Sequence, residues 1–366
     1  MKIAYFTNYI TYHTGGPRFL MQIAEGMAQR GHEVAVITGA TYDRTPPNIK
    51  VVDLRIYRGG LLPYMQPLNV IRYLRKATSI LRDMGDHYDV VHTDSHFPNL
   101  LPLLSPNKTP KVCSIYHFES PDVITGVAPR VGLPLVQLAE TNSTCTAIHV
   151  LSRSVKRQVE RLRLLRNPIY VIPPGIYAEK YRKYTRRPEE GLYLMVGRLE
   201  PRKHYDHAIA AFRIVKEVKP NYRLLIVGDG PQRAELEKLI KRLGLERTVH
   251  LLGRITEEEK LDLMSRAAAL IHLGYPEGFG IAILEAIAMG TPVITYDIPP
   301  LNELAIPDVT GIVIPKDDVM TLAKTILEFD LQKYNESRLR NLAQRFDIEN
   351  IIKQFEKLYY KLIEKI

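Results

Sequence analysis

The sequence predicts an α/β protein with two doubly wound parallel sheets of the Rossmann-like type. The first observation is the length of 366 residues, which is enough for two domains of ordinary size. The second is the alternation of short apolar runs with segments of helical periodicity through both halves of the chain. The third is the proline and glycine segment at residues 173–175, followed by the polar run 179–190. We therefore expect a first domain at residues 1–174 and a second at residues 175–345.

The first half begins with an apolar strand at residues 2–7, a glycine pair and a helix at about residues 17–30. Pro17 stands at the start of this helix and Gly31 directly after its end, which is the asymmetry expected of helix termini. Further strands are predicted at residues 33–37, 90–92, 111–116, 147–151 and 170–172, and helices at residues 69–84, 133–141 and 152–162. The strand runs lack clean alternation, which is typical of parallel strands covered on both faces.

The second half repeats this rhythm. Strands are predicted at residues 192–196, 223–227, 249–252, 269–272, 292–295 and 312–314, and helices at residues 205–218, 231–243, 257–266, 281–289 and 319–329. The last stretch, residues 347–366, carries one apolar stripe at helical spacing and is expected to pack on the protein rather than on a membrane. Ligands of open α/β sheets bind at the carboxyl ends of the strands, so we expect two domains that face each other across a cleft.

Composition narrows the class of protein. The chain is 45% apolar and 25% charged, as globular proteins are. Cys113 and Cys145 are the only cysteines, and we expect two separate buried thiols in a reducing compartment. The first residues lack the long apolar core of a secretory signal, and no run of 18 apolar residues occurs. A cytoplasmic location is expected, with peripheral attachment to the inner face of the membrane as a hypothesis.

The net charge of +10 is unevenly distributed. Residues 1–183 hold 23 Lys and Arg and 13 Asp and Glu, so the whole excess lies in the first half. Two stretches concentrate it, at residues 56–82 and 153–166. Their basic residues are Arg58, Arg72, Arg75, Lys76, Arg82, Arg153, Lys156, Arg157, Arg161, Arg163 and Arg166, and Leu61, Leu62, Tyr64 and Met65 add apolar groups to the first. An anionic membrane surface would suit both stretches. The alternative is a solvated surface, with Ile71, Leu74 and Leu81 facing the core. No nucleic-acid partner is expected, because no recognised binding module is present.

The most informative stretch is residues 276–293, PEGFGIAILEAIAMGTPV. Glu277 is predicted in a loop before a helix, and Glu285 follows on the second turn of that helix. The glycines between them allow close approach of a ligand, and the N–H groups of the first helical turn attract an anion. This arrangement suits a ligand with a phosphate and two polyhydroxyl ends, which describes a nucleotide-sugar. The alternative is an ordinary strand–helix turn with two glutamates placed by chance.

Three other loops follow predicted strands. Residues 197–203, GRLEPRK, place Arg198 and Lys203 where they can neutralise a diphosphate leaving group, although a solvated basic loop is the alternative. Gly15 and Gly16 follow the first strand without completing a dinucleotide fingerprint, which disfavours a dehydrogenase. His117 ends the strand at 111–116 and is a candidate contact for a sugar, although such histidines usually have no special role. His92 and His96 also flank a strand end, but no third ligand at diagnostic spacing supports a metal site.

Taken in order, the runs GRLEPRK, GDGP, LLGRI and PEGFGIAILEAIAMGTPVI resemble the retaining family 4 glycosyltransferases with the GT-B fold. The opening strand, the glycine pair and RGHEVAVIT are similar to the N-terminal domain of that family, and IPPG and the last helix also match. The resemblance implies a nucleotide-sugar donor domain at residues 175–345 and an acceptor-side domain at residues 1–174. It also implies that the helix at residues 346–366 packs back on the first domain.

The resemblance further implies the roles of single residues. Arg198 and Lys203 would bind the donor diphosphate, Glu277 would hold hydroxyls of the donor sugar, and His117 would contact the sugar near its anomeric carbon. These four residues are therefore the predicted catalytic set. The predicted donor-binding residues are Gly15 and Gly16 at the phosphates, Arg254 and Ile255 at the base, the backbone of Phe279, Gly280, Ile281 and Ala282, and Glu285 at the ribose. No metal or other cofactor is expected.

The resemblance implies front-face transfer of a hexose, in which the leaving phosphate helps to deprotonate the acceptor hydroxyl. The loops at residues 272–276 and 298–303 depart from the pattern of the family. Because both would line the donor pocket, the base and the hexose stay open, with mannose or glucose favoured. The hydroxyl acceptor is expected to be lipid-linked or phosphate-bearing. The alternatives are a soluble sugar-phosphate or glucan synthase, a nucleotide-sugar epimerase of the same fold and a non-catalytic nucleotide-sugar sensor.

Overall fold

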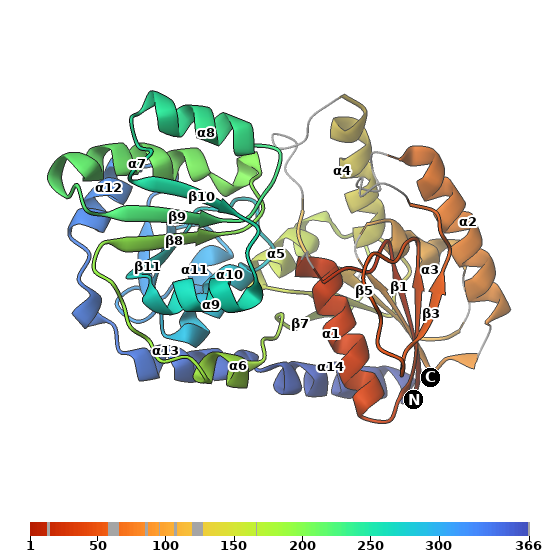
Figure 1. The fold of residues 1–366 in the computed structure, drawn as a ribbon. Coiled ribbons are helices and arrows are strands. Elements are labelled where there is room, and N and C mark those ends of the chain that lie inside the picture. The colour runs from red at the N-terminus through yellow and green to blue at the C-terminus, as the bar shows by residue number, and fades with distance from the viewer. Residues whose placement is uncertain are drawn as a thin grey trace. The chain divides into compact units, whose positions relative to one another are not determined.

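The computed structural model describes residues 1–12, 15–57, 66–84, 87–94, 96–105, 108–118, 127–165 and 167–364, and only the helical course of the backbone at 127–133. These residues form two compact units (Figure 1). The first unit contains Met1–Gly175 and Ile348–Ile366, and the second contains Ile176–Asp347. Among the described residues, no helix has the length and apolar character that crossing a bilayer requires.

The first unit is built on a seven-stranded parallel sheet with the order β3-β2-β1-β4-β5-β6-β7. The strands are β1 (Lys2–Thr7), β2 (Glu33–Thr38), β3 (Lys50–Asp53), β4 (Val90–Asp94), β5 (Lys111–Ile115), β6 (Ala147–Val150) and β7 (Ile169–Val171). The chain starts at β1, builds toward β3, and then reverses to add β4 on the other side of β1. The carboxyl ends of β1 and β4 therefore form the switch point at which open α/β sheets bind ligands.

Helices cover both faces of this sheet. They are α1 (Gly15–Gln29), α2 (Pro67–Asp83), α3 (Leu101–Leu104), α4 (Val127–Thr141), α5 (Arg153–Leu162) and α14 (Ile348–Ile363), with a 3-10 turn η3 (Phe97–Leu100). The last helix, α14, lies beside α1 (Figure 1). A Cβ atom on Gly26 of α1 would overlap Ile352 of α14, so this glycine permits the close packing of the two helices.

A chain of buried hydrogen bonds joins α14 to the sheet. The Tyr359 hydroxyl lies 2.6 Å from Nδ1 of His92 on β4, and Nε2 of His92 lies 2.6 Å from Oγ of Ser114 on β5. The same Oγ lies 2.7 Å from Nδ1 of His149 on β6, whose Nε2 lies 2.8 Å from the carbonyl oxygen of Ile172. Both ring nitrogens of His92 are thus engaged within the core. His92 therefore does not pair with His96 as a metal ligand.

The second unit contains a six-stranded parallel sheet with the order β10-β9-β8-β11-β12-β13. The strands are β8 (Leu192–Val196), β9 (Arg223–Val227), β10 (Val249–Gly253), β11 (Ala269–His272), β12 (Val293–Tyr296) and β13 (Gly311–Ile314). Its switch point lies between β8 and β11, because the strand order reverses there.

Most helices of the second unit lie between successive strands, whereas one precedes its first strand and two follow its last strand. The helices are α6 (Ala178–Arg182), α7 (Tyr205–Val218), α8 (Arg233–Arg242), α9 (Glu257–Arg266), α10 (Ile281–Met289), α11 (Leu301–Leu304), α12 (Val319–Leu327) and α13 (Glu336–Ala343). Three 3-10 turns accompany them: η5 (Pro201–Lys203), η6 (Leu331–Lys333) and η7 (Gln344–Phe346). The core is apolar and is built from Tyr193, Phe212, Ile226, Ile271 and their buried neighbours between sheet and helices.

The predicted fold class is confirmed by these two parallel sheets, although several elements differ from the prediction. β3 was not predicted, because KVVD is a short, half-buried edge strand without an apolar run. α1 begins at Gly15 rather than Pro17, and α4 begins at Val127 rather than residue 133. α13 was also missed, because only two of its residues are buried and its apolar signal is weak.

The expectation of two separate thiols is wrong, because Cys113 and Cys145 form a disulfide. Cys113 lies on β5, and Cys145 lies just before β6, the strand that pairs with β5. The strand pairing brings their Cα atoms within 6.0 Å of each other across 32 residues of sequence. Spacing along the chain does not reveal such a pair, because it depends on which strands are neighbours.

Candidate active site

Glu277 lies in the loop that joins β11 to α10, at the carboxyl end of the second sheet. The loop turns into the helix through Gly280, which has φ 96° and is the N-cap of α10. A side chain is disfavoured in this left-handed conformation, so glycine is the residue that the turn requires. The Glu277 side chain is 13% exposed. The loop thus holds a carboxylate inside the protein immediately before a helix N-terminus.

Two cations and a histidine surround this carboxylate. Nζ of Lys203 contacts Oε1 of Glu277, and Nη1 of Arg202 lies 3.1 Å from the same oxygen. Nε2 of His272, at the end of β11, lies 3.6 Å away. Burial alone would raise the pKa of the Glu277 carboxyl, but the charges of Lys203 and Arg202 hold this pKa well below its ordinary value. Glu277 is therefore ionised at neutral pH.

His272 has the opposite electrostatic character. Burial and the nearby charge of Lys203 lower the pKa of its imidazole, although Glu277 opposes that shift. The His272 imidazole is thus neutral at neutral pH, and it adds no positive charge to the group of residues around Glu277. His272 is not among the predicted site residues, because it ends an apolar strand and belongs to no recognised motif.

The lack of a side chain at Gly274 allows Glu277, His272 and Lys203 to lie close together. A Cβ atom at this position would lie 2.7 Å from Oε1 of Glu277, 3.1 Å from Nε2 of His272 and 3.1 Å from Cδ of Lys203. The absence of a side chain therefore makes room for the ion pair. This glycine belongs to the segment that departs from the expected family pattern.

The basic loop after β8 contributes its residues unequally. Lys203 is only 12% exposed and is directed to Glu277. Arg198 is 52% exposed, and its Nε lies 3.0 Å from Oε1 of Glu200. The second oxygen of Glu200 accepts a hydrogen bond from Nε of Arg202 at 3.0 Å. Arg198 is therefore linked to Glu277 indirectly, through Glu200 and Arg202. Arg202 is not among the residues predicted from the sequence, although it stands within the GRLEPRK motif itself.

Glu285 lies on the second turn of α10 and is 3% exposed. Its Oε2 accepts a hydrogen bond at 2.9 Å from Nζ of Lys260 on α9, which also lies 3.1 Å from Glu257. Burial alone would lower the pKa of Lys260, but the two carboxylates hold it above its ordinary value. The predicted ribose-binding glutamate is thus one member of a buried ion pair. Lys260 was not predicted, because nothing in the sequence of α9 indicates that it faces α10.

The remaining predicted donor contacts lie around the start of α10 and the end of β10. Phe279 is 6% exposed, with its ring centroid 5.7 Å from that of Phe346. Ile281 and Ala282 are half-buried in the first helical turn. Arg254 is exposed and Ile255 is half-buried, both in the turn between β10 and α9. The partial positive charge of the helix N-terminus makes this turn of α10 suitable for an anion.

The first unit places its predicted residues at the carboxyl end of its own sheet. Gly15 and Gly16 begin α1. A Cβ atom on Gly16 would lie 3.0 Å from the ring of Tyr116, the residue that directly precedes His117. His117 is half-buried after β5, and its ring centroid lies 6.1 Å from that of His96. The glycine loop and the histidine are therefore neighbours within this unit, as a shared binding edge requires.

The two basic stretches are only partly described. Arg58, Leu61, Leu62, Tyr64, Met65 and Arg166 lie outside the described residues. On α2, Ile71 is 62% exposed, Leu74 is half-buried and Leu81 is 1% exposed, so the alternative in which all three face the core is wrong for Ile71. On α5, Arg153, Arg157 and Arg161 are exposed. Leu164, just beyond this helix, is 84% exposed.

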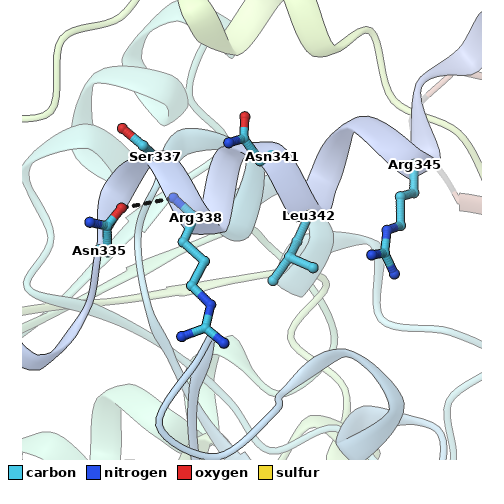
Figure 2. A pocket seen from close by; sticks show the side chains of 6 residues that line it. All are labelled: Asn335, Ser337, Arg338, Asn341, Leu342 and Arg345. Atoms are coloured by element: carbon cyan, nitrogen blue, oxygen red, sulfur yellow. Dashed lines mark hydrogen bonds between the residues drawn. The ribbon is translucent and has the colours of Figure 1, made fainter.

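A separate hollow of about 520 Å³ runs along α13 (Figure 2). Its lining residues are Asn335, Ser337, Arg338, Asn341, Leu342 and Arg345. The backbone N–H of Arg338 donates a hydrogen bond of 2.9 Å to Oδ1 of Asn335, which caps the helix. Figure 2 marks this hydrogen bond with a dashed line. The other side chains spread apart along the helix surface (Figure 2). None of the predicted site residues lines this hollow, and the convergent charges of the second unit lie instead around Glu277.

Two family models match the chain in succession. Residues 13–180 match the model described as Glycosyltransferase Family 4, and residues 177–346 match the one described as Glycosyl transferases group 1. The chain belongs to the family 4 glycosyltransferases. This assignment agrees with the two parallel-sheet units of the structure and confirms the prediction of a family 4 glycosyltransferase.

Individual relatives of this glycosyltransferase differ in length. An exopolysaccharide phosphotransferase of Streptomyces coelicolor is 31% identical over 287 residues, which are 76% of this chain but only 29% of that protein. The gpi3 subunit of a phosphatidylinositol N-acetylglucosaminyltransferase from Schizosaccharomyces pombe is 24% identical over 360 residues, 93% of this chain and 76% of the relative. The crystal structure of the Anabaena protein HepE in complex with UDP and glucose is similar in fold, with a TM-score of 0.74. The two sequences are 20% identical, and the structural match covers 99% of this chain and 100% of HepE.

Proposed function

We propose that this glycosyltransferase moves a hexose, with mannose or glucose favoured, from a nucleoside diphosphate sugar to a hydroxyl acceptor with retention of anomeric configuration. The observation that carries the proposal is the ionised and largely enclosed Glu277 beside Lys203 and Arg202. This cluster lies at the carboxyl ends of β8 and β11, the switch point of the second sheet, and directly precedes the N-terminus of α10. HepE, with the same fold, binds UDP and glucose.

The charged side chains of the site have separate roles in the proposed reaction. Without donor, Lys203 and Glu277 satisfy each other. When donor binds, the ammonium of Lys203 and the guanidinium of Arg198 stabilise the diphosphate, which gains negative charge as its bond to the sugar breaks. The Glu277 carboxylate accepts hydrogen bonds from sugar hydroxyls, and Glu285 accepts those of the ribose. His117, at the end of β5, is the proposed contact near the anomeric carbon.

Retention follows from attack on the face that the leaving group vacates. The bond from C1 to the phosphate oxygen breaks, the acceptor oxygen bonds to C1 on the same face, and the acceptor proton passes to the leaving phosphate. The side chains then contribute positioning and charge stabilisation rather than a covalent intermediate. Because Arg198 and Lys203 supply the positive charge, we propose that no metal ion is needed for donor binding.

The proposed acceptor is lipid-linked or phosphate-bearing and is reached at an anionic membrane surface. The exposed arginines of α5 with Leu164 support this, as do Ile71 and the exposed Arg72, Arg75 and Lys76 of α2. Basic surfaces with exposed apolar side chains bind anionic headgroups through charge and apolar contact together. The name of the Schizosaccharomyces relative includes phosphatidylinositol, which is an anionic lipid.

The donor is tested by the thermal stability of the purified chain against UDP-, GDP- and ADP-sugars, with and without Mg²⁺. A ligand at a hundred times its Kd should stabilise the fold by about 2.7 kcal/mol. We expect stabilisation by sugars of one base, independent of Mg²⁺, lost in Lys203→Ala and Glu285→Ala and kept in the surface control Arg338→Ala. If no nucleotide-sugar stabilises the wild type, or the two variants respond like the control, the assigned donor site is wrong.

Stereochemistry and acceptor need their own measurements. The anomeric configuration of the product, read by NMR from an α-linked donor, should be α, and a β product would exclude retention. Sedimentation with vesicles of anionic phospholipid at low salt should pellet the protein, and Arg153→Ala with Arg157→Ala should weaken pelleting. Equal pelleting with neutral vesicles, or none with either, would contradict the membrane proposal.

A further inference from the structure

A second cluster of ligand-type side chains lies at the start of α7, outside the glutamate loop. His204, Asp206 and His207 each offer one nitrogen or oxygen, and these three atoms all lie within 4.8 Å of one another. The side chain of His207 is 24% exposed and that of Asp206 is 50% exposed. The cluster is therefore open to an ion from solvent, yet it is partly embedded in the protein.

The backbone at His204 is unusual for its residue type. His204 is the N-cap of α7 with φ 50° and ψ 44°, a left-handed conformation that favours glycine. Its side chain makes no capping hydrogen bond, so helix capping does not explain the histidine. The conformation instead places its ring over that of His207, with centroids 4.8 Å apart. Residues in sparsely populated backbone conformations cluster at active sites and ligand-binding sites.

His207 is already oriented as metal-binding histidines are. Its Nδ1 lies 2.5 Å from the hydroxyl of Tyr296 on β12, and Oδ1 of Asp317 lies 3.8 Å from the same nitrogen. When Nδ1 donates its proton to the Tyr296 oxygen, Nε2 keeps a lone pair. That Nε2 lies 3.8 Å from Oδ2 of Asp206. Ligating histidines commonly donate their other N–H to an oxygen in this way.

We propose that His204, Asp206 and His207 form a binding site for a divalent transition-metal ion of the zinc type. Two imidazoles and one carboxylate suit Zn²⁺, whereas Mg²⁺ and Ca²⁺ prefer all-oxygen sites. Tetrahedral bonds of ~2.0–2.1 Å place ligand atoms ~3.4 Å apart, so side-chain rotation must shorten the separations, which reach 4.8 Å, by up to about 1.4 Å. Three protein ligands leave a fourth position for water.

The ion would have a structural role. His204 directly follows Lys203, and Asp317 and Tyr296 come from the loop after β13 and from β12. An ion held here would tie the end of the basic loop to the start of α7. The site is independent of the proposed transfer reaction, because none of its three ligands belongs to the predicted donor contacts.

The test is titration of the full-length protein with ZnCl₂ and MgCl₂, by calorimetry and by thermal unfolding. We expect one Zn²⁺ per chain, a rise in Tm of about 5 °C at a hundred times the Kd, and no rise with Mg²⁺. His204→Ala and His207→Ala should each weaken Zn²⁺ binding at least tenfold. His250→Ala, a histidine of β10 in the same unit, should bind as the wild type does.

His204→Gly separates binding from folding. Glycine relieves the left-handed backbone, so the Tm of this variant without metal should equal or exceed that of the wild type, while the rise with Zn²⁺ should disappear. The proposal is overturned if wild type binds no Zn²⁺, if Mg²⁺ binds as well as Zn²⁺, or if His204→Gly and His207→Ala retain the full response.

Discussion

The hydroxyl of Tyr359 lies 2.6 Å from Nδ1 of His92, although 267 residues separate the two in the chain. The Tyr5 hydroxyl lies 3.2 Å from the Tyr359 oxygen at one end of the network, and His149 reaches a backbone carbonyl at the other. One set of protons satisfies every member: each hydroxyl or Nε2–H donates to the next group, and both histidines are neutral. The last helix is thus joined to β4 by a fully buried hydrogen bond.

Tyr359→Phe tests this bond. The change removes the donor and leaves Nδ1 of His92 buried without a partner, which should lower the free energy of unfolding by about 1–3 kcal/mol. Urea unfolding followed by circular dichroism measures the loss. Tyr360→Phe is the matched control, because Tyr360 is 45% exposed on the same helix and should change stability by less than about 0.5 kcal/mol. Equal effects of the two changes would contradict the role of the network.

The histidines predict a loss of stability in mild acid. Burial lowers the pKa of His149 to about 4 and that of His92 well below its ordinary value of 6.5. Between pH 6.5 and 4 the unfolded chain binds protons that the folded chain refuses, so the free energy of unfolding falls as pH falls. His149 alone should contribute about 3 kcal/mol across that range. Urea unfolding at pH 7, 5 and 4 should show a shallower pH dependence in His149→Gln than in the wild type, and an unchanged one would contradict the shift.

Lys260 and Glu285 should be coupled in stability. Lys260→Met removes the cationic partner of the buried Glu285 carboxylate, which should cost about 3–5 kcal/mol of unfolding free energy. Glu285→Gln added to that variant should recover part of the loss, and a double-mutant cycle in urea gives the coupling energy. Lys180→Met is the control, because this partly exposed lysine pairs with Glu257 and should cost less than about 1 kcal/mol. If the effects of Lys260→Met and Glu285→Gln on the free energy of unfolding were additive, the ion pair between the two residues would contribute nothing to stability.

Gly274→Ala should impair donor binding more than folding. The added Cβ meets mainly the ends of flexible side chains, Glu277 and Lys203 among them, which can move aside but then lose their arrangement. We expect a modest change in Tm but a loss of most of the stabilisation by the nucleotide-sugar. Gly31→Ala is the matched control. Gly31 has φ 84° and no atom lies within 4 Å of the new Cβ, so the change should lower the free energy of unfolding by about 1 kcal/mol and leave donor binding intact. If Gly274→Ala binds donor normally, the close fit at Glu277 is unimportant.

The candidate site was only partly visible in the sequence. The order of motifs identified the loops, since loops at the carboxyl ends of parallel strands meet at one edge of the sheet. It did not show that Lys203 rather than Arg198 contacts Glu277, nor that Arg202 and His272 complete the group. Those contacts depend on the path of each loop. They also depend on Gly274, because a side chain at this position would occupy the space that Glu277 and Lys203 fill. Lys260 was invisible for the same reason, because it meets Glu285 only when α9 and α10 pack together.

The sequence by itself determined the two parallel sheets and the family, because apolar periodicity, helix-terminal residues and motif order are local properties of the chain. Only the tertiary structure decided which side chains meet. Cys113 joins Cys145 because β5 and β6 are neighbours, and His92 receives the hydrogen bond of Tyr359 because α14 packs on the first sheet. The charge state of Glu277 was decided there too, since burial and two adjacent cations act on it together only in the folded protein.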